Sequence, residues 1–169
     1  MKICDIKAKH TLPFEIDDVK LIRLFSFYLH SAPTIESETA KKVEDEHRFL
    51  DNWTNFISQL PQDRIKFYSN SFSTEQFINS FKKYGLNDEA KVNRRTKAIV
   101  CKKKDKDESD CCCLLRHIRN SIAHNHVYIF NAGNRKYILF EDLNKNKKIS
   151  ARILLTQTDL KKLKNEILK

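Results

Sequence analysis

Apolar residues recur at helical spacing in four stretches of the chain, and this pattern predicts four helices. We expect the first over residues 17–31, the second over 36–60, just before Pro61, and the third over 73–84. The fourth, over residues 110–125, has the clearest apolar arc on one side of a helix. Its apolar positions are Cys111, Leu114, Leu115, Ile118 and Ile122.

Residues with special backbone roles stand at the ends of two of these stretches. Thr74 is the expected N-cap of the third helix, and Gly85 suits the left-handed position after its last turn. Ser109 or Asp110 can cap the start of the fourth helix. Residues 1–14 show no comparable pattern, and we expect them to form an irregular lead-in.

The pattern changes after the fourth helix. Residues 127–130 and 136–140 are rich in β-branched and aromatic side chains, and Gly133 between them can supply the positive φ of a tight turn. A hairpin is therefore predicted, followed by a third strand over 149–155. Thr156, followed three residues later by an aspartate, resembles a capping box and predicts a closing helix.

Residues 87–109 are the most charged and least periodic part of the chain, and we expect a mostly exposed connection. Ile99 and Val100 are its weak apolar anchors. The basic run of Lys102, Lys103 and Lys104 has two interpretations. It is either a solvated loop or a loop that binds the phosphates of RNA.

Together these elements predict one mainly α domain over residues 1–169. A helical bundle is expected over 1–126, a small antiparallel β-meander over 127–155, and a closing helix over 156–169. The 2 glycines and 3 prolines agree with this prediction, because they are too few for a β-protein with many tight turns.

The charge of the chain favours a polyanionic partner. Lysine and arginine total 32 against 22 acidic residues, which gives a net charge of +10 and suits nucleic acid or an anionic membrane surface. No apolar run approaches the ~18 residues of a membrane span, and the start lacks the apolar region of a secretory signal. The 5 cysteines, three of them adjacent, favour reduced thiols. A cytoplasmic protein without a membrane partner is therefore expected.

The segment from Arg116 to His126 holds two arginines and three histidines within eleven residues. On an ideal helix Arg116, Asn120 and His124 form an outward polar stripe. Arg119 and His124 differ by ~140° in direction and ~7.5 Å in rise, so one helix does not aim both at one small group. Either the helix unwinds near His124, or two copies of the motif meet across a symmetric dimer.

These side chains suit the cleavage of RNA without a metal ion. A histidine with a near-neutral pKa can accept the proton of a 2′-OH group or donate one to the leaving 5′-oxygen. An arginine can hold the phosphate with two N–H donors and offset the charge that develops in the transition state.

The run from Arg119 to His124 resembles the R-x4–6-H motif of the HEPN superfamily, with Asn120 in the polar position after the arginine. The sequence from Leu114 to Leu155 resembles the defence-associated HEPN proteins of the pEK499 p136 type. This resemblance implies a helical bundle and a metal-independent endoribonuclease that acts as a homodimer. It also implies that Arg119 and His124 are the catalytic pair and that Asn120 supports them.

Each of these residues also has a plainer interpretation. Arg119 can be a surface residue, and His124 a helix C-terminal residue favoured by the macrodipole. Arg116 is either a second RNA contact or an exposed helix residue. We expect His117 to be solvated and His126 to be structural.

Zinc is the remaining chemical possibility. Cys111, Cys112 and Cys113, with Cys101 and His117, offer ligand types that zinc prefers. Adjacent cysteines lack the spacing of structural zinc sites, so no metal and no cofactor is expected.

The sequence therefore favours an RNA-cleaving HEPN enzyme in phage defence or acting as a toxin, with an antitoxin or another defence protein as a further partner. The first alternative is a catalytically inactive HEPN module that binds RNA or a partner protein. A second alternative is a basic structural adaptor without an RNA role. Only the enzyme generates new RNA ends.

Overall fold

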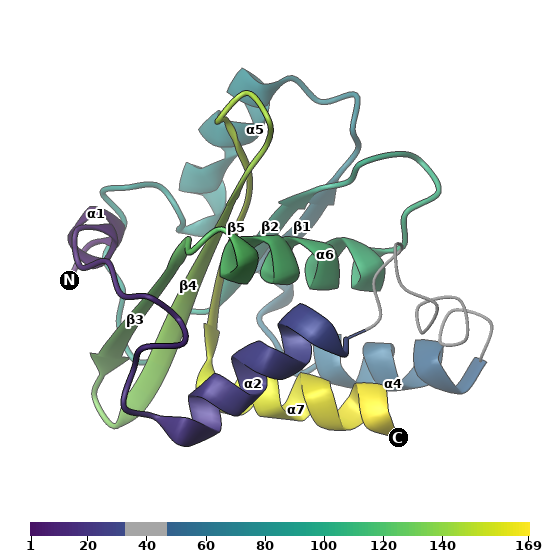
Figure 1. Cartoon of the computed structure of the whole chain (residues 1–169). Coiled ribbons are helices and arrows are strands. Elements are labelled where there is room, and N and C mark those ends of the chain that lie inside the picture. The colour runs from purple at the N-terminus through teal and green to yellow at the C-terminus, as the bar shows by residue number, and fades with distance from the viewer. Residues whose placement is uncertain (33–46) are drawn as a thin grey trace.

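A five-stranded mixed sheet lies at the centre of the computed structural model, with the strand order β1-β2-β5-β4-β3 (Figure 1). β1 pairs with β2 in parallel, and all other neighbours are antiparallel. The structure describes residues 1–32 and 47–169, and for 47–50 the backbone alone. The strands are β1 (Ile65–Tyr68), β2 (Ala98–Lys102), β3 (Val127–Ala132), β4 (Arg135–Leu143) and β5 (Ile149–Thr156).

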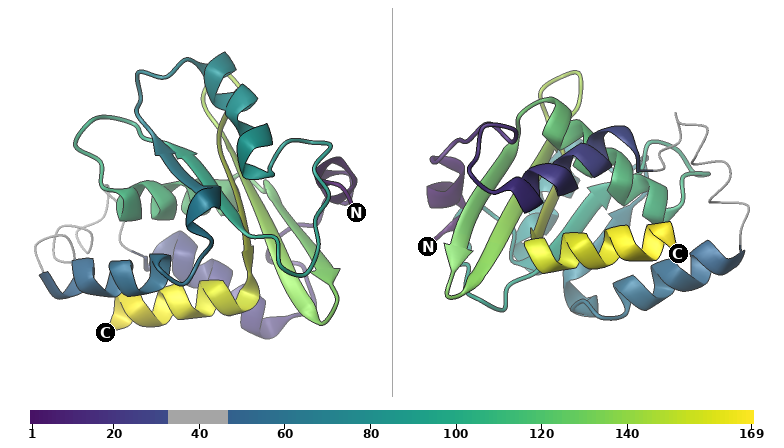
Figure 2. Two further views of the ribbon diagram at one scale, coloured as in Figure 1. Left: turned by 180° about the vertical axis from the view of Figure 1, so that it is seen from behind. Right: turned by 60° about the horizontal axis from the view of Figure 1, so that its bottom comes forward.

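Helices cover both faces of this sheet (Figure 2). The first face is covered by α2 (Val19–His30), α4 (His47–Ile57), α6 (Asp110–Ala123) and α7 (Gln157–Leu168). The second face carries the short α1 (Ile3–Lys7), α5 (Thr74–Ser80) and the 3₁₀ turn η2 (Phe81–Tyr84), and a further 3₁₀ turn, η1 (Gln62–Arg64), precedes β1. In the described part of the chain, no helix has the length and apolar character needed to cross a membrane.

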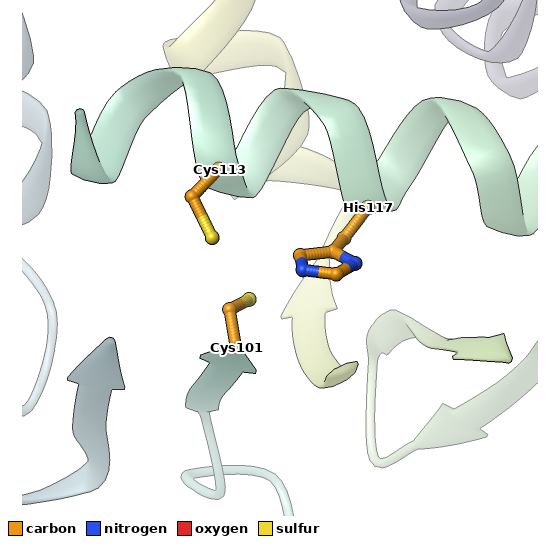
Figure 3. Close-up of side chains that lie close together, drawn as sticks. All are labelled: Cys101, Cys113 and His117. Atoms are coloured by element: carbon orange, nitrogen blue, oxygen red, sulfur yellow. The ribbon is translucent and has the colours of Figure 1, made fainter. Parts of the chain in front are cut away.

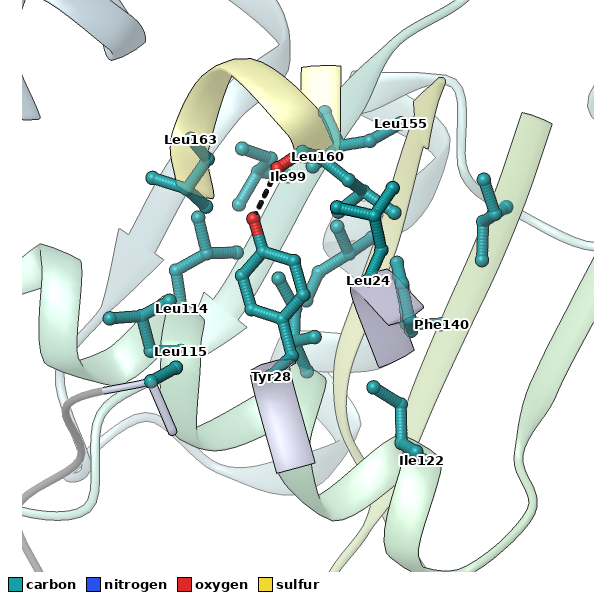
Figure 4. Packing of buried hydrophobic residues seen from close by; sticks show 14 of the residues in the cluster. Leu24, Tyr28, Ile99, Leu114, Leu115, Ile122, Phe140, Leu155, Leu160 and Leu163 are labelled. Atoms are coloured by element: carbon teal, nitrogen blue, oxygen red, sulfur yellow. Dashed lines mark hydrogen bonds between the residues drawn. The ribbon is translucent and has the colours of Figure 1, made fainter. Parts of the chain in front are cut away.

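The alternation of side chains along the strands divides the interior into two cores. In β2, Ile99 and Cys101 face the first core, while Ala98 and Val100 face the second. Leucines of α6 and α7 surround Tyr28 in the first core, where its hydroxyl donates a hydrogen bond to the carbonyl of Leu160 (Figure 4).

The prediction of a mainly α bundle with only a small β-meander is wrong. Strands β1 and β2 come from the part expected to be helices and an exposed connection, and they extend the meander into a five-stranded sheet. In β2 the residues from Ala98 to Cys101 are all buried. A strand buried on both faces forms a short continuous apolar run without alternation, and the lysines and arginines around this one obscured it.

Several local predictions are confirmed. Ser109 caps α6 with its side chain, Gly85 and Gly133 have positive φ, and Thr156 forms a capping box with Asp159 at the start of α7. Two local predictions are wrong. The N-cap of α5 is Ser73 rather than Thr74, and residues 3–7 of the expected lead-in form α1. The first half of the helix predicted over residues 36–60 lies outside the described residues, and its described part ends at Ile57.

One buried arginine organises the polar contacts on the second face. Arg152 of β5 has a side chain that is only 2% exposed. Its guanidinium donates to Glu141 from Nε at 3.0 Å and from Nη2 at 2.7 Å. Nη1 donates to the carbonyl of Leu86 at 2.7 Å and to Asp88 at 3.0 Å, and the group lies over the ring of Phe81. The buried charge is therefore paired and makes four hydrogen bonds, which offsets the cost of its burial.

Candidate active site at the end of helix α6

The position of His124 is set by the way α6 ends. Ala123 is the last helical residue and His124 is the C-cap. Asn125 follows in the left-handed conformation with φ of 61°, and its N–H donates to the carbonyl of Ile122. The N–H of His126 donates to the carbonyl of Ser121. This is the Schellman arrangement, which ends a helix and turns the chain, here into β3.

His124 is exposed and lines a surface hollow of about 650 Å³. The other lining residues are His126, Leu143, Asn144, Lys145 and Lys147. The turn between β4 and β5 supplies the lysines, and the Asn144 side chain holds that turn by accepting hydrogen bonds from two backbone N–H groups. Two imidazoles and two ammonium groups thus surround one concave space, a set that suits a phosphate group and proton transfer.

His126 and the two lysines were not singled out as functional residues from the sequence. The signal that identifies them is topological. β4 ends and β5 begins at the edge of the sheet where α6 passes into β3, so the turn at 144–148 meets the end of the helix.

Arg116 and Asn120 do not form an outward stripe with His124, as the sequence suggested. Arg116 is half-buried and donates to Glu108 from Nε at 2.7 Å and from Nη2 at 2.9 Å. Asn120 donates to Asp142 at 3.2 Å. Both partners are buried and lie outside α6, so the helix periodicity by itself predicted the wrong directions for these two side chains. Burial opposes ionisation of Glu108, but its hydrogen bonds with Arg116 prevail and lower its pKa.

The catalytic pair implied by the motif is not assembled around the hollow. Arg119 is half-exposed on α6, and the residues that line the hollow include His124 but not Arg119. The basic run of Lys102, Lys103 and Lys104 also lies outside the residues that line the His124 hollow. Lys102 is the last residue of β2, Lys103 forms an ion pair with Asp110 at 2.9 Å, and Lys104 is exposed in the following turn.

His117 is completely buried, which corrects the expectation that it is solvated. Its Nδ1 lies 2.7 Å from Asp142, and its Nε2 lies 2.8 Å from the carbonyl oxygen of Lys102. Both neighbours accept hydrogen bonds, so both ring nitrogens are protonated. Burial disfavours the charged ring, but the hydrogen bonds with Asp142 and Cys113 outweigh it and raise the pKa of His117 to about 9.

Cys101, Cys113 and His117 are the described residues best placed to hold a metal ion (Figure 3). Their ligand atoms lie within 4.8 Å of one another, and all three residues are buried. To bind a metal, either ring nitrogen of His117 would lose a hydrogen bond: Nδ1 the one with Asp142, or Nε2 the one with the carbonyl of Lys102. The geometry therefore favours a protonated, hydrogen-bonded histidine over a metal ligand.

This network predicts that stability depends on pH. The folded pKa of His117, about 9, lies above the ordinary value of 6.5, so its contribution is lost as pH rises through 9. We expect the free energy of unfolding of the wild type to exceed that of His117→Gln by less at about pH 10 than at about pH 7. Urea denaturation at the two pH values tests this, and a difference that does not change with pH would contradict it.

The comparisons with known proteins agree with the resemblance of the motif. The model of a family described as HEPN pEK499 p136 matches residues 17–169. The comparison with curated proteins and the comparison with solved structures find no match. The matched range includes every element from α2 to α7 and leaves out α1.

Proposed function

Because the chain belongs to the HEPN pEK499 p136 family, which indicates a nuclease or RNA-binding role, we propose that it is a metal-independent endoribonuclease. The observation that carries the proposal is the exposed His124, held at the end of α6 beside a second histidine and two lysines in one hollow. A role in phage defence or as a toxin follows from the same family resemblance. An antitoxin or another defence protein is then a further partner.

In the proposed reaction the 2′-oxygen of one nucleotide attacks the adjacent phosphorus, and the bond from phosphorus to the 5′-oxygen breaks. His124 accepts the proton of the 2′-OH or donates one to the leaving oxygen. The guanidinium of Arg119 holds the phosphate and offsets the charge that develops on it. The products are a 2′,3′-cyclic phosphate and a 5′-OH end. Asn120, through its hydrogen bond with Asp142, steadies the helix between the two catalytic residues.

The basic residues have separate roles in this proposal. Lys102, Lys103 and Lys104 offer phosphate contacts beyond the reacting group. Arg116 contributes through its positive charge and through its pairing with Glu108, which anchors the start of α6. Lys145 and Lys147 line the hollow itself, and in this proposal they neutralise the phosphate that reacts there.

A direct test is the incubation of the purified protein with total RNA in the presence of EDTA, followed by analysis of the new ends. We expect cleavage products with 2′,3′-cyclic phosphate and 5′-OH ends. RNA that is bound but uncut would contradict the enzyme and support the second candidate, a catalytically inactive HEPN module. The position of Arg119 outside the His124 hollow is the observation that favours this alternative.

The separation of the catalytic pair predicts a homodimer. His124 lies just beyond the end of α6, and Arg119 does not line its hollow, so we expect a second copy to bring an arginine to each histidine. We expect sedimentation to show a dimer at micromolar concentration. A monomer with full ribonuclease activity under the same conditions would disprove the composite site.

A further inference from the structure

A second hollow, of about 710 Å³, lies at the other end of the sheet between α2, the hairpin of β3 and β4, and the start of α7. Amide and hydroxyl groups line it together with cations, and its lining residues include no carboxylate. The cations are Lys20, Arg23, Arg135, Lys136, Lys161 and Lys164. A concave surface with charge of one sign concentrates the electrostatic field and attracts a polyanion.

Most of this charge is not neutralised within the protein. Lys136 is the exception, because its ammonium lies 2.6 Å from Asp18. Among the residues that the structure describes, no carboxylate forms an ion pair with Lys20, Arg23 or Lys161, and all three are exposed. These cations are therefore available to a ligand.

The cations continue around the turn of the hairpin. A smaller hollow of about 280 Å³ is lined by Arg94, Arg95, Asn134 and Arg135. It shares Asn134 and Arg135 with the larger hollow, so the two form one continuous surface, which we call the basic groove. Positive charge thus extends from α2 across the hairpin to the loop before β2.

We propose that the basic groove binds the sugar-phosphate backbone of single-stranded RNA, at a place separate from the His124 hollow. The choice of RNA rests on the proposed function. The extended run of cations matches the regular charges of a nucleic acid backbone, and the amides of Asn131, Asn134 and Gln157 can form hydrogen bonds with bases. A concave, polar lining fits a strand better than a flat lipid surface.

The two hollows lie at opposite ends of β4. Arg135 begins this strand at the basic groove, and Leu143 ends it at the His124 hollow. Eight steps of ~3.4 Å along a strand separate these residues by about 27 Å. An RNA that occupies both places is therefore much longer than the dinucleotide that is cut, and the groove selects long single strands.

The test uses fluorescence anisotropy with labelled single-stranded RNAs of about 20 and about 4 nucleotides over a series of KCl concentrations. All proteins carry His124→Ala so that the RNA stays intact. Lys20→Gln with Lys161→Gln removes two charges from the groove. Lys82→Gln with Lys91→Gln is the matched control, because these exposed lysines line neither hollow.

We expect the groove pair to weaken binding of the long RNA about tenfold or more at low salt, and to reduce the slope of log affinity against log salt by about 1.4. The control pair should leave the slope unchanged, and the short RNA should bind weakly to every protein. If the groove pair and the control pair lose RNA affinity equally, net charge alone determines binding, and the proposal is overturned. So would unchanged RNA binding by the groove pair together with reduced binding to vesicles of anionic phospholipid.

These outcomes are distinct from those that test the enzyme. Loss of RNA binding in the groove pair supports the proposal that the basic groove binds RNA, even where the wild type produces no new RNA ends. Cleavage by the wild type with unchanged RNA affinity in the groove pair supports the enzyme and rejects the groove.

Discussion

Replacing His124 with alanine is expected to lower the rate of RNA cleavage about 100-fold or more, which corresponds to roughly 3 kcal/mol of activation free energy. Acid–base help from an imidazole acts on the transition state more than on the bound substrate, so RNA binding should persist. The exposed side chain of His124 contributes little packing, and the thermal midpoint of unfolding should stay near that of the wild type. Cleavage rates and anisotropy on the same RNA measure the two effects separately.

His30→Ala is a matched control, because His30 is an exposed residue of α2 outside the hollow, and it should cleave at the wild-type rate. Arg119→Ala should lose activity together with some affinity, since a guanidinium holds the phosphate before and during the reaction. Equal cleavage by the wild type and a well-folded His124→Ala variant would reject the catalytic assignment and leave the RNA-binding module.

The second large effect is expected from Arg152→Met. This change leaves Glu141, whose side chain is 8% exposed, with Lys7 as its remaining ion-pair partner at 3.1 Å. It also removes the donors to the Leu86 carbonyl and to Asp88. Removal of one member of a buried ion pair typically costs ~3–5 kcal/mol, because the other charge stays buried. Urea denaturation should therefore show a loss of this size in the free energy of unfolding.

Two further variants show whether the loss of Arg152 as partner of the buried Glu141 is the cause. Adding Glu141→Leu to Arg152→Met should recover part of the lost stability, since the buried carboxylate that has lost its arginine is removed. Arg95→Met, at an exposed position, should change stability by less than about 0.5 kcal/mol. A loss below about 1 kcal/mol for Arg152→Met would show that the buried network is not a main source of stability.

The parts of the fold that the sequence predicted well are those determined by near neighbours. The apolar arc and N-cap of α6, the hairpin around Gly133 and the capping box of α7 all depend on residues a few positions apart. β1 and β2 pair in parallel across about thirty residues, and such pairing leaves no local pattern. Each strand is also only four or five residues long.

The candidate site, too, could be predicted from the sequence only where near neighbours determine it. The position of His124 at the end of a helix followed from the pattern of 110–125. The inward directions of Arg116 and Asn120 did not follow from it, because their buried partners Glu108 and Asp142 lie in a loop and a strand, and the local sequence gives no sign of that burial. Lys145 joined the site only once the order of the strands was known.

The place of β5 in the sheet has a consequence for synthesis on the ribosome. β5 lies between β2 and β4, so the pair β1-β2 and the hairpin β3-β4 have no common partner until residue 156 has emerged. The turn that precedes β5 also supplies Lys145 and Lys147 to the hollow of His124. A nascent chain therefore completes the His124 hollow only late in translation, after the turn at 144–148 and β5 have left the ribosome.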